Sequence, residues 1–308
     1  MNWFLLALAA MFCWSGSDLF SKMGSRPDDR YSHWKMVMAV GLVMGLHAAY
    51  TIFVEGVRLT MGDIIAYLPA SALYILSMVL GYVGLRYIEL SISSPICNTS
   101  GAMAALFCLI FRSEPIPSLT VGGVELPLGI FAILAMAAGV LMLGIVEARE
   151  DEEIRAARQQ EANVRYAKSF LALLLPILYC VLDAAGTVAD SIILETLDEA
   201  VANTAYELTF LAMGVVAAVY VLGVRRQKLE IPREGPKLAA AACETAGQLA
   251  YVYAIAANTV GAAPIISCYC LVSVLWARIF LKEKLSKKHY IAIAIAAVGI
   301  VVMGILDP

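Results

Sequence analysis

The sequence contains two copies of one unit, and this internal repeat constrains the fold more than any other feature. The segment SISSPICNTSGAMAALFCLIFRSEP aligns without a gap with VGAAPIISCYCLVSVLWARIFLKEK, so that Pro95 and Pro264 lie 169 residues apart. Further along, Gly139 pairs with Gly299 at an offset of 160, which leaves nine extra residues in the first copy. We expect these residues in the loop-like run 117–125. A repeat of this size determines the architecture of a chain.

Composition identifies the environment of the repeat. Hydrophobic residues make up 61% of the chain and charged residues 15%, against about 45–50% and 25% in soluble domains. The chain is therefore expected to be a polytopic membrane protein, and a weak two-fold repeat in such a chain is typical of a secondary transporter. The basic residues form short clusters rather than one stripe, which argues against nucleic acid as a partner. The seven Cys residues lie in apolar runs without a CxxC pair, so we expect no metal site and no cofactor.

The apolar residues form ten continuous runs, each close to the roughly 20 residues that a helix needs to cross a bilayer. The runs are Trp3–Phe20, His33–Val54, Ile64–Leu85, Ile92–Phe111, Leu126–Val146, Ser169–Ala189, Asn203–Val224, Leu238–Ala257, Val260–Leu281 and Tyr290–Ile305. Continuous runs exclude a spanning β-barrel, whose strands alternate. Because each copy has an odd number of helices, successive copies enter the membrane from opposite sides. The expected fold is an all-α integral membrane protein with ten transmembrane helices in two inverted five-helix repeats, 1–146 and 168–308, joined by a charged linker, 147–167.

The segments around the fourth and ninth runs carry a family resemblance. A glutamate follows each run in a short loop, FRSEPIPS and FLKEKLSKK, and a Gly-rich helix comes next, AAGVLMLGI and AVGIVVMGI. This pattern resembles the EamA-type transporters of the drug/metabolite transporter superfamily. The resemblance implies a protein that moves small organic solutes through a central cavity between two inverted halves. The family usually has a proline midway along these two helices, whereas we expect Pro95 and Pro264 near the helix starts, where proline is tolerated.

Basic residues indicate the orientation. Nineteen of the 22 Lys and Arg residues lie in or beside the connectors that join odd-numbered runs to the next even-numbered run. By the positive-inside rule these connectors are cytoplasmic and both termini lie outside. The resemblance implies the reverse, because the termini of the family are usually cytoplasmic. We expect a multi-pass protein of a cell membrane, such as a bacterial inner membrane, with lipid around it.

Polar side chains inside the apolar runs are the candidates for substrate binding, because a charge at the centre of a membrane helix costs about 2.5–3.5 kcal/mol on insertion scales. In the eighth run Glu244, Gln248 and Tyr251 follow the i, i+4, i+7 spacing of one helix face. Similar stripes occur in other runs. The predicted substrate-binding residues are Trp14, Tyr74, Asn98, Asp183, Glu244, Gln248, Tyr251, Tyr269 and Ser273.

The intramembrane acids also have structural interpretations. Glu244 lies about 10 Å below the basic face at 1.5 Å per residue, where an ion pair with Arg278 competes with a position facing the cavity. Asp183 lies near the opposite interface, where its carboxylate could reach water. Asp190 and Glu207 are closer still to an interface and are expected to be helix-end residues.

We expect a secondary or facilitated transporter of a small organic solute, since the ATP-binding motif GxxxxGK[ST] does not occur. An amino-acid-like zwitterion and an organic cation both fit the acids, amides and aromatic residues. Protons are a possible second substrate, and His47 serves either in hydrogen-bonded packing or in a proton relay. The alternatives are an assembly protein, which would not need intramembrane acids, and an intramembrane enzyme, for which the YD and GxGD protease signatures do not accompany the acids. The sequence does not indicate an oligomeric state.

The charge distribution predicts the location of the termini. A fluorescent protein that matures only in the cytoplasm should stay dark when fused to either end of the chain, because both ends are expected outside. A reporter enzyme active only outside the cytoplasm should be active at the same positions and serves as the matched control. Fluorescence from a terminal fusion would show that the charge count gives the wrong orientation.

Overall fold

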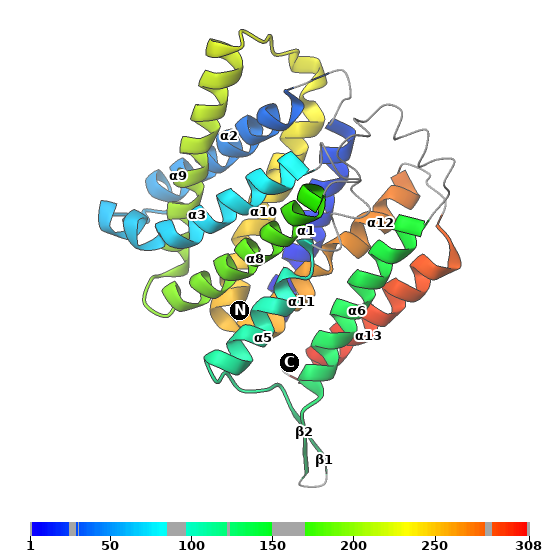
Figure 1. The fold of residues 1–308 in the computed structure, drawn as a ribbon. Helices are drawn as coiled ribbons and strands as arrows, with labels where there is room; N and C mark the ends of the chain where they lie inside the picture. Colours follow the sequence, from blue (N-terminus) through cyan, green and yellow to red (C-terminus); the bar gives the residue numbers. More distant parts are fainter. Residues whose placement is uncertain are drawn as a thin grey trace.

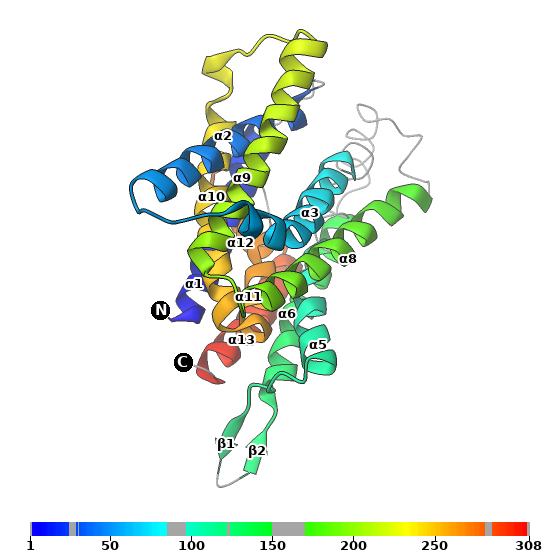
Figure 2. The same ribbon diagram turned by 90° about the vertical axis from the view of Figure 1, so that its left-hand side faces the viewer.

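A computed structural model describes residues 2–24, 29, 31–84, 97–121, 124–149, 170–280 and 285–306. The described chain is a bundle of helices with one small hairpin (Figures 1 and 2). The first half contributes α1 (Trp3–Gly24), α2 (Ser32–Phe53), α3 (Met61–Gly84), α5 (Ser100–Phe111) and α6 (Leu128–Arg149). The second half contributes α8 (Phe170–Ile193), α9 (Glu199–Ala218) with its π-helical continuation η1 (Val219–Val224), the 3-10 turn η2 (Ile231–Arg233), α10 (Gly235–Ala257), α11 (Thr259–Ser267), α12 (Tyr269–Phe280) and α13 (Lys287–Leu306).

Eight helical stretches within the described residues are long and apolar enough to cross a membrane. They correspond to eight of the ten predicted runs, which makes the chain a multi-pass membrane protein. Of the other two runs, Ile92–Phe111 is described only from residue 97 onward and contains the shorter helix α5. Leu238–Ala257 forms α10, whose length is sufficient but whose polar stripe lowers its hydropathy. The predicted linker 147–167 lies largely outside the described residues.

The ninth run is one predicted helix that the structure divides in two. Pro264 is the sixth residue of α11 rather than part of its first turn, so the expectation that it lies near the helix start was wrong. Proline has no N–H to donate to the preceding turn, and α11 ends three residues after it. At the break, Cys268 donates its backbone N–H to Ile265 and its thiol to the carbonyl of Pro264. Pro95 lies outside the described residues.

The extra residues of the first copy lie in a β-hairpin. Strand β1 (Leu119–Val121) pairs antiparallel with β2 (Val124–Leu126), between α5 and α6. Gly129 at the start of α6 donates its N–H to the carbonyl of Pro117 at 2.8 Å, which fixes the base of the hairpin. The hairpin projects from the end of the bundle toward which both termini lie (Figures 1 and 2). The connector between α9 and α10, which belongs to the predicted basic face, lies at the opposite end (Figure 1).

Each major helix contact joins one half of the chain to the other. The contacts pair α1 with α10, α3 with α8, α2 with α9, α5 with α11, and α6 with α13. Figure 1 shows α6 and α13 side by side and running in opposite directions. The two halves are therefore intertwined, and the space that they share lies between helices of both.

The contact between α6 and α13 is reciprocal. A Cβ atom added to Gly139 would lie 2.7 Å from the carbonyl oxygen of Ala292, and one added to Gly299 would lie 2.7 Å from that of Ala132. Ala132 and Ala292 are separated by 160 residues, as are the two glycines. Gly139 thus contacts Ala292, and its equivalent in the second copy, Gly299, contacts Ala132, which is the equivalent of Ala292 in the first copy. Only the missing side chain allows the two backbones to approach so closely.

Substitution of either glycine should therefore destabilise the protein to a similar degree. Gly139→Ala and Gly299→Ala force the backbones of α6 and α13 apart, an overpacking that typically costs about 1–3 kcal/mol. The matched control is Gly223→Ala, because an added Cβ at Gly223 has no neighbour within 4 Å. Thermal unfolding of the purified protein in detergent should show a lower Tm for both variants and no decrease for the control. Equal Tm values for all three variants would contradict the reciprocal contact.

Candidate functional site

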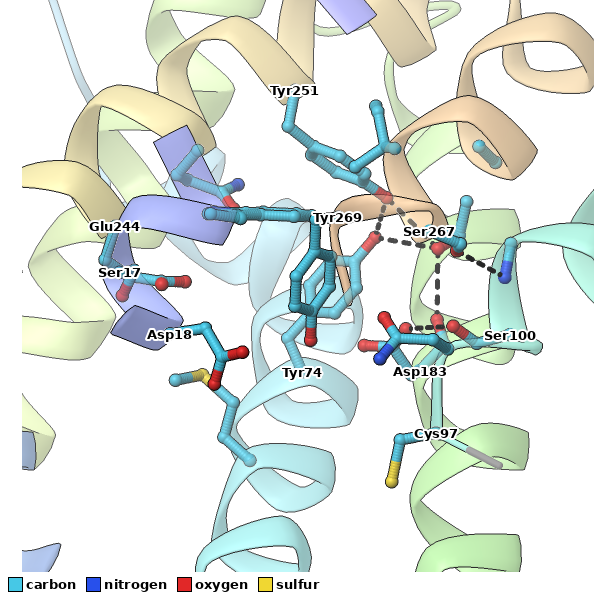
Figure 3. A pocket seen from close by; sticks show the side chains of 18 of the residues that line it. Ser17, Asp18, Tyr74, Cys97, Ser100, Asp183, Glu244, Tyr251, Ser267 and Tyr269 are labelled. Atoms are coloured by element: carbon cyan, nitrogen blue, oxygen red, sulfur yellow. Dashed lines mark hydrogen bonds between the residues drawn. The ribbon is translucent and has the colours of Figure 1, made fainter. Parts of the chain in front are cut away.

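A cavity of about 220 Å³ lies between helices of both halves and is the candidate site (Figure 3). Its lining comes from α1, α3, α5, α8, α9, α10, α11 and α12, together with the residues just before α5. Eight of the nine residues predicted to bind substrate line this cavity: Trp14, Tyr74, Asn98, Asp183, Glu244, Gln248, Tyr251 and Tyr269. The structure therefore brings together residues that are as far as 255 positions apart in the chain.

Aromatic rings form much of the wall. The ring of Trp14 on α1 lies 5.1 Å from that of Tyr251 and 6.1 Å from that of Tyr269, measured between centroids. Gly247 on α10 makes this position possible, because a Cβ atom there would lie 2.4 Å from the indole ring. On the opposite side Tyr74 stands edge-on to Tyr251, with centroids 6.0 Å apart. The cavity thus offers several ring faces to a ligand.

Three carboxylates line the cavity. Glu244 on α10 lines the cavity beside Ser17 and Asp18, both on α1. On α8, Asp183 accepts a hydrogen bond of 2.7 Å from the Ser100 hydroxyl of α5. Among the described residues that line the cavity, none is Lys, Arg or His. The charge of the cavity is therefore negative whenever these acids are ionised.

The ion pair considered for Glu244 is not found. Both side chains are described, and no ion pair joins Glu244 to Arg278, which is exposed on α12. Glu244 instead faces the cavity with Gln248 and Tyr251, one and two turns further along α10. The geometry favours the cavity-facing interpretation of this carboxylate.

A cluster of tyrosines closes the cavity on the side of the termini. The hydroxyls of Tyr74 and Tyr251 are hydrogen-bonded to each other, and that of Tyr251 donates to Thr187 at 3.1 Å. Beyond them, Tyr67 donates to Asp190 at 2.5 Å, and both residues are fully buried. Tyr67 lies near the start of α3 and Asp190 near the end of α8, which both face the termini. We refer to these five residues as the floor.

Ser273 is the predicted binding residue that lies outside the cavity. It follows Tyr269 by one turn of α12, but it is buried and its hydroxyl donates to the carbonyl of Tyr269 at 3.1 Å. Beyond this point α12 packs against α1, where the indole N–H of Trp276 donates to Ser15 at 2.9 Å. The stripe on α12 therefore leaves the cavity after Tyr269, and Ser273 does not line it.

Two acids expected at helix ends are buried instead. Asp190 belongs to the floor. Glu207 on α9 is fully buried, and both of its carboxylate oxygens lie within 2.9 Å of Nδ1 of His47 on α2. Asn203 donates to the same carboxylate at 3.0 Å. The sequence position of Glu207 did not predict this burial, because the burial results from the packing of α9 against α2. This contact is consistent with the packing interpretation of His47, and it joins two helices from different halves.

Charges at the end of the bundle opposite the termini are also paired. Lys237 at the start of α10 is buried, and its ammonium lies 2.6 Å from the Glu234 carboxylate. Lys35 on α2 binds Asp29 at 2.7 Å and Glu234 at 3.7 Å. Although partial burial acts to raise it, the hydrogen bonds from Lys35 and from the backbone of Tyr31 hold the pKa of Asp29 below its usual value. This cluster joins α2 to the start of α10. Among the described residues that line the cavity, the acids have no Lys or Arg beside them.

Several lining residues had not been predicted. Tyr179 lies four residues before Asp183 on the same face of α8, so extension of that stripe by one turn would have found it. Ser267 has no such signal. It reaches the cavity because its hydroxyl accepts the backbone N–H of Gly101, 166 residues away, at 3.0 Å. The other unpredicted polar lining residues are Ser17, Cys97, Ser100 and Tyr206, whereas Asp18, Ser21 and Thr187 continue the predicted stripes of Trp14 and Asp183.

Apolar helices that surround a polar cavity between two halves are typical of polytopic membrane transporters. A solved crystal structure of a protein aligns with a TM-score of 0.68, covering 99% of this chain and 97% of that chain, at 14% sequence identity. At this identity the likeness concerns the fold alone. A search of curated proteins finds no matching sequence.

The family follows from the sequence. The model of the EamA-like transporter family matches residues 1–143 and 170–305, which is most of the chain. The chain therefore belongs to the EamA-like transporter family, as its repeated FRSEP and FLKEK loops indicated. The family consists of membrane transporters of small solutes rather than enzymes.

The buried pair of Glu207 and His47 should contribute to stability. Glu207→Ala leaves His47 and Asn203 without their acceptor, and the loss of such hydrogen bonds typically costs about 1–3 kcal/mol. The matched control is Glu125→Ala, because Glu125 is exposed on the hairpin. Thermal unfolding in detergent should show a lower Tm for Glu207→Ala alone. An unchanged Tm would mean that the pair is not stabilising.

Proposed function

We propose that this protein transports small organic cations across a cell membrane by alternating access, and that Glu244 binds either a proton or the cation. The observation that carries this proposal is the charge of the cavity. Three carboxylates line it, while the described lining residues include no Lys, Arg or His. A cation would neutralise the acids and would lie over aromatic faces, an arrangement that stabilises ammonium groups. An anionic solute would meet repulsion from the same lining.

A zwitterionic solute, such as an amino acid, is the second candidate. It is favoured by two buried donors in the lining, the indole N–H of Trp14 and the amide nitrogen of Gln248, which have no hydrogen-bond partner within the described residues. A carboxylate could accept from both while an amino group binds an acid. A zwitterion leaves the net charge of the cavity unchanged, whereas a cation reduces it, so we favour the cation.

We further propose that the ten predicted runs span the membrane as two inverted repeats, 1–146 and 168–308. The contacts of Gly139 and Gly299 support this arrangement. Reciprocal contacts between equivalent residues are the mark of a two-fold axis. Because α6 and α13 run in opposite directions (Figure 1), that axis is perpendicular to the helices. In a membrane it would lie in the plane of the bilayer, as in inverted repeats.

The proposed orientation places the basic connectors in the cytoplasm and the termini outside. The floor then separates the cavity from the outer side, because Tyr67 and Asp190 lie toward the end of the bundle that carries the termini. The structure would correspond to a state that faces the cytoplasm. Transport would require a second state in which the floor opens and the opposite end closes.

Uptake into proteoliposomes tests the proposed substrate class. Tetramethylammonium and butylamine should be taken up in a saturable manner that depends on the protein, and an opposing proton gradient should drive their accumulation. Leucine is the zwitterionic probe. Uptake of leucine without uptake of either cation would favour the second candidate, and the absence of uptake of all three would overturn the proposal. Empty liposomes provide the background.

Replacement of Glu244 tests the coupling. Glu244→Gln keeps the shape of the side chain but cannot release a proton. Gradient-driven accumulation of butylamine should therefore fall to the background, while exchange of butylamine without a gradient should be less affected. The matched control is Glu125→Gln on the exposed hairpin, which should transport as the unmodified protein does.

The double variant Glu244→Gln with Arg278→Gln distinguishes this role from an ion pair. If Glu244 served only to neutralise Arg278, removal of both charges would restore stability and transport. We expect no recovery, because the structure places Glu244 in the cavity. Recovery of gradient-driven transport would remove Glu244 from the mechanism and leave Asp183 as the next candidate.

A further inference from the structure

The acids of the cavity are divided between two groups of helices. The first pole consists of Asp18 on α1 and Glu244 on α10, two helices that pack against each other. The second pole is Asp183 on α8, a helix that packs against α3 and α5. Figure 3 shows the two poles on opposite sides of the cavity, with Tyr269 between them. Asp18 and Asp183 both lie near enough to Tyr269 to act electrostatically on its hydroxyl.

The two poles are built alike. Asp18 follows Trp14 by four residues on α1, and Asp183 follows Tyr179 by four residues on α8. This spacing places each acid and its aromatic residue on one helix face, and all four residues line the cavity. Since α1 and α8 are the first helices of the two halves, the same aromatic and acidic pair occurs once in each half. A site with this internal symmetry suits a ligand with two equivalent ends.

An independent feature points to a bound polar group. Gln248 is 3% exposed and lines the cavity, yet its amide nitrogen has no hydrogen-bond partner within the described residues. A buried amide without a partner is costly, and a ligand in the cavity would satisfy it.

We propose that the substrate is a linear dication, such as an alkane diamine, whose two ammonium groups bind the first and second poles. This inference rests on the proposed transport of cations and specifies the substrate class. Each end would pair with carboxylate and lie beside Trp14 or Tyr179. The hydrocarbon chain between the ends would cross the aromatic wall near Tyr269, where it loses contact with water.

A binding series tests the dication directly. The probes are the α,ω-diamines with four, six and eight carbons, each compared with the monoamine of equal length, and Kd is measured by isothermal titration calorimetry on the purified protein. At least one diamine should bind about tenfold more tightly than its monoamine, as expected for an added charge-assisted hydrogen bond. Equal affinities at all lengths would overturn the dication and leave cation transport intact. Absence of binding by every amine would overturn both proposals.

The second pole gives a sharper test. Asp183→Asn should bring the affinity for the best diamine down to that for the matched monoamine. Asp183→Glu keeps the charge but moves it inward by one methylene, so the preferred diamine should become shorter. A structural role for Asp183 would lower the affinity for all amines without a change in preferred length. If Asp183→Asn does not fold, the length preference of Asp183→Glu still decides the matter, and an unchanged preference overturns the assignment.

Discussion

A carboxylate cannot face hydrocarbon without a large free-energy cost, and the arrangement of this protein depends on that constraint. The apolar helices α1, α8, α9 and α10 carry acids that are either buried or line the cavity. These positions require other helices to cover the acids, and the covering helices come from the opposite half of the chain. The constraint on a few polar atoms thus accounts for the intertwining of the two halves. Equally close packing joins α6 to α13, where Gly139 contacts Ala292 and Gly299 contacts Ala132.

The acids fall into two kinds once their partners are known. The Lys237 ammonium offsets the charge of Glu234, while Glu207 is hydrogen-bonded to His47 on α2 and accepts from Asn203. Such pairs fasten helices together. The carboxylates of the cavity have hydroxyl neighbours such as Ser17 and Ser100 instead. A hydroxyl donates one hydrogen bond without neutralising the charge, which leaves these acids able to bind a proton or a cation. Under the proposed function, the acids that fasten helices and the acids that bind substrate would differ in their partners rather than in their depth in the membrane.

Much of this arrangement could be predicted from the sequence, because helix periodicity is a local property. The apolar runs gave the helices, and the spacing of Glu244, Gln248 and Tyr251 placed three side chains on one face that does line the cavity. The sequence-based predictions failed where contacts between residues far apart in the chain determine the position of a side chain. Ser273 has the same spacing from Tyr269, but the contact of α12 with α1 removes it from the cavity. The break at Cys268 depends on how α11 responds to Pro264, and Ser267 reaches the cavity only through its bond to Gly101, on a helix from the other half.

The floor would affect how well the protein preserves an ion gradient across the membrane. Its residues are joined by hydrogen bonds that cross from α3 to α8 and α10, so that Tyr74, Tyr251 and Thr187 hold one another in place. A single side chain that rotates away leaves the others still bonded. In the proposed mechanism, an ion that enters the cavity alone would meet a barrier that does not open one residue at a time. Passage of a solute would require whole helices to move, so that both tightness and transport would depend on the residues of the floor.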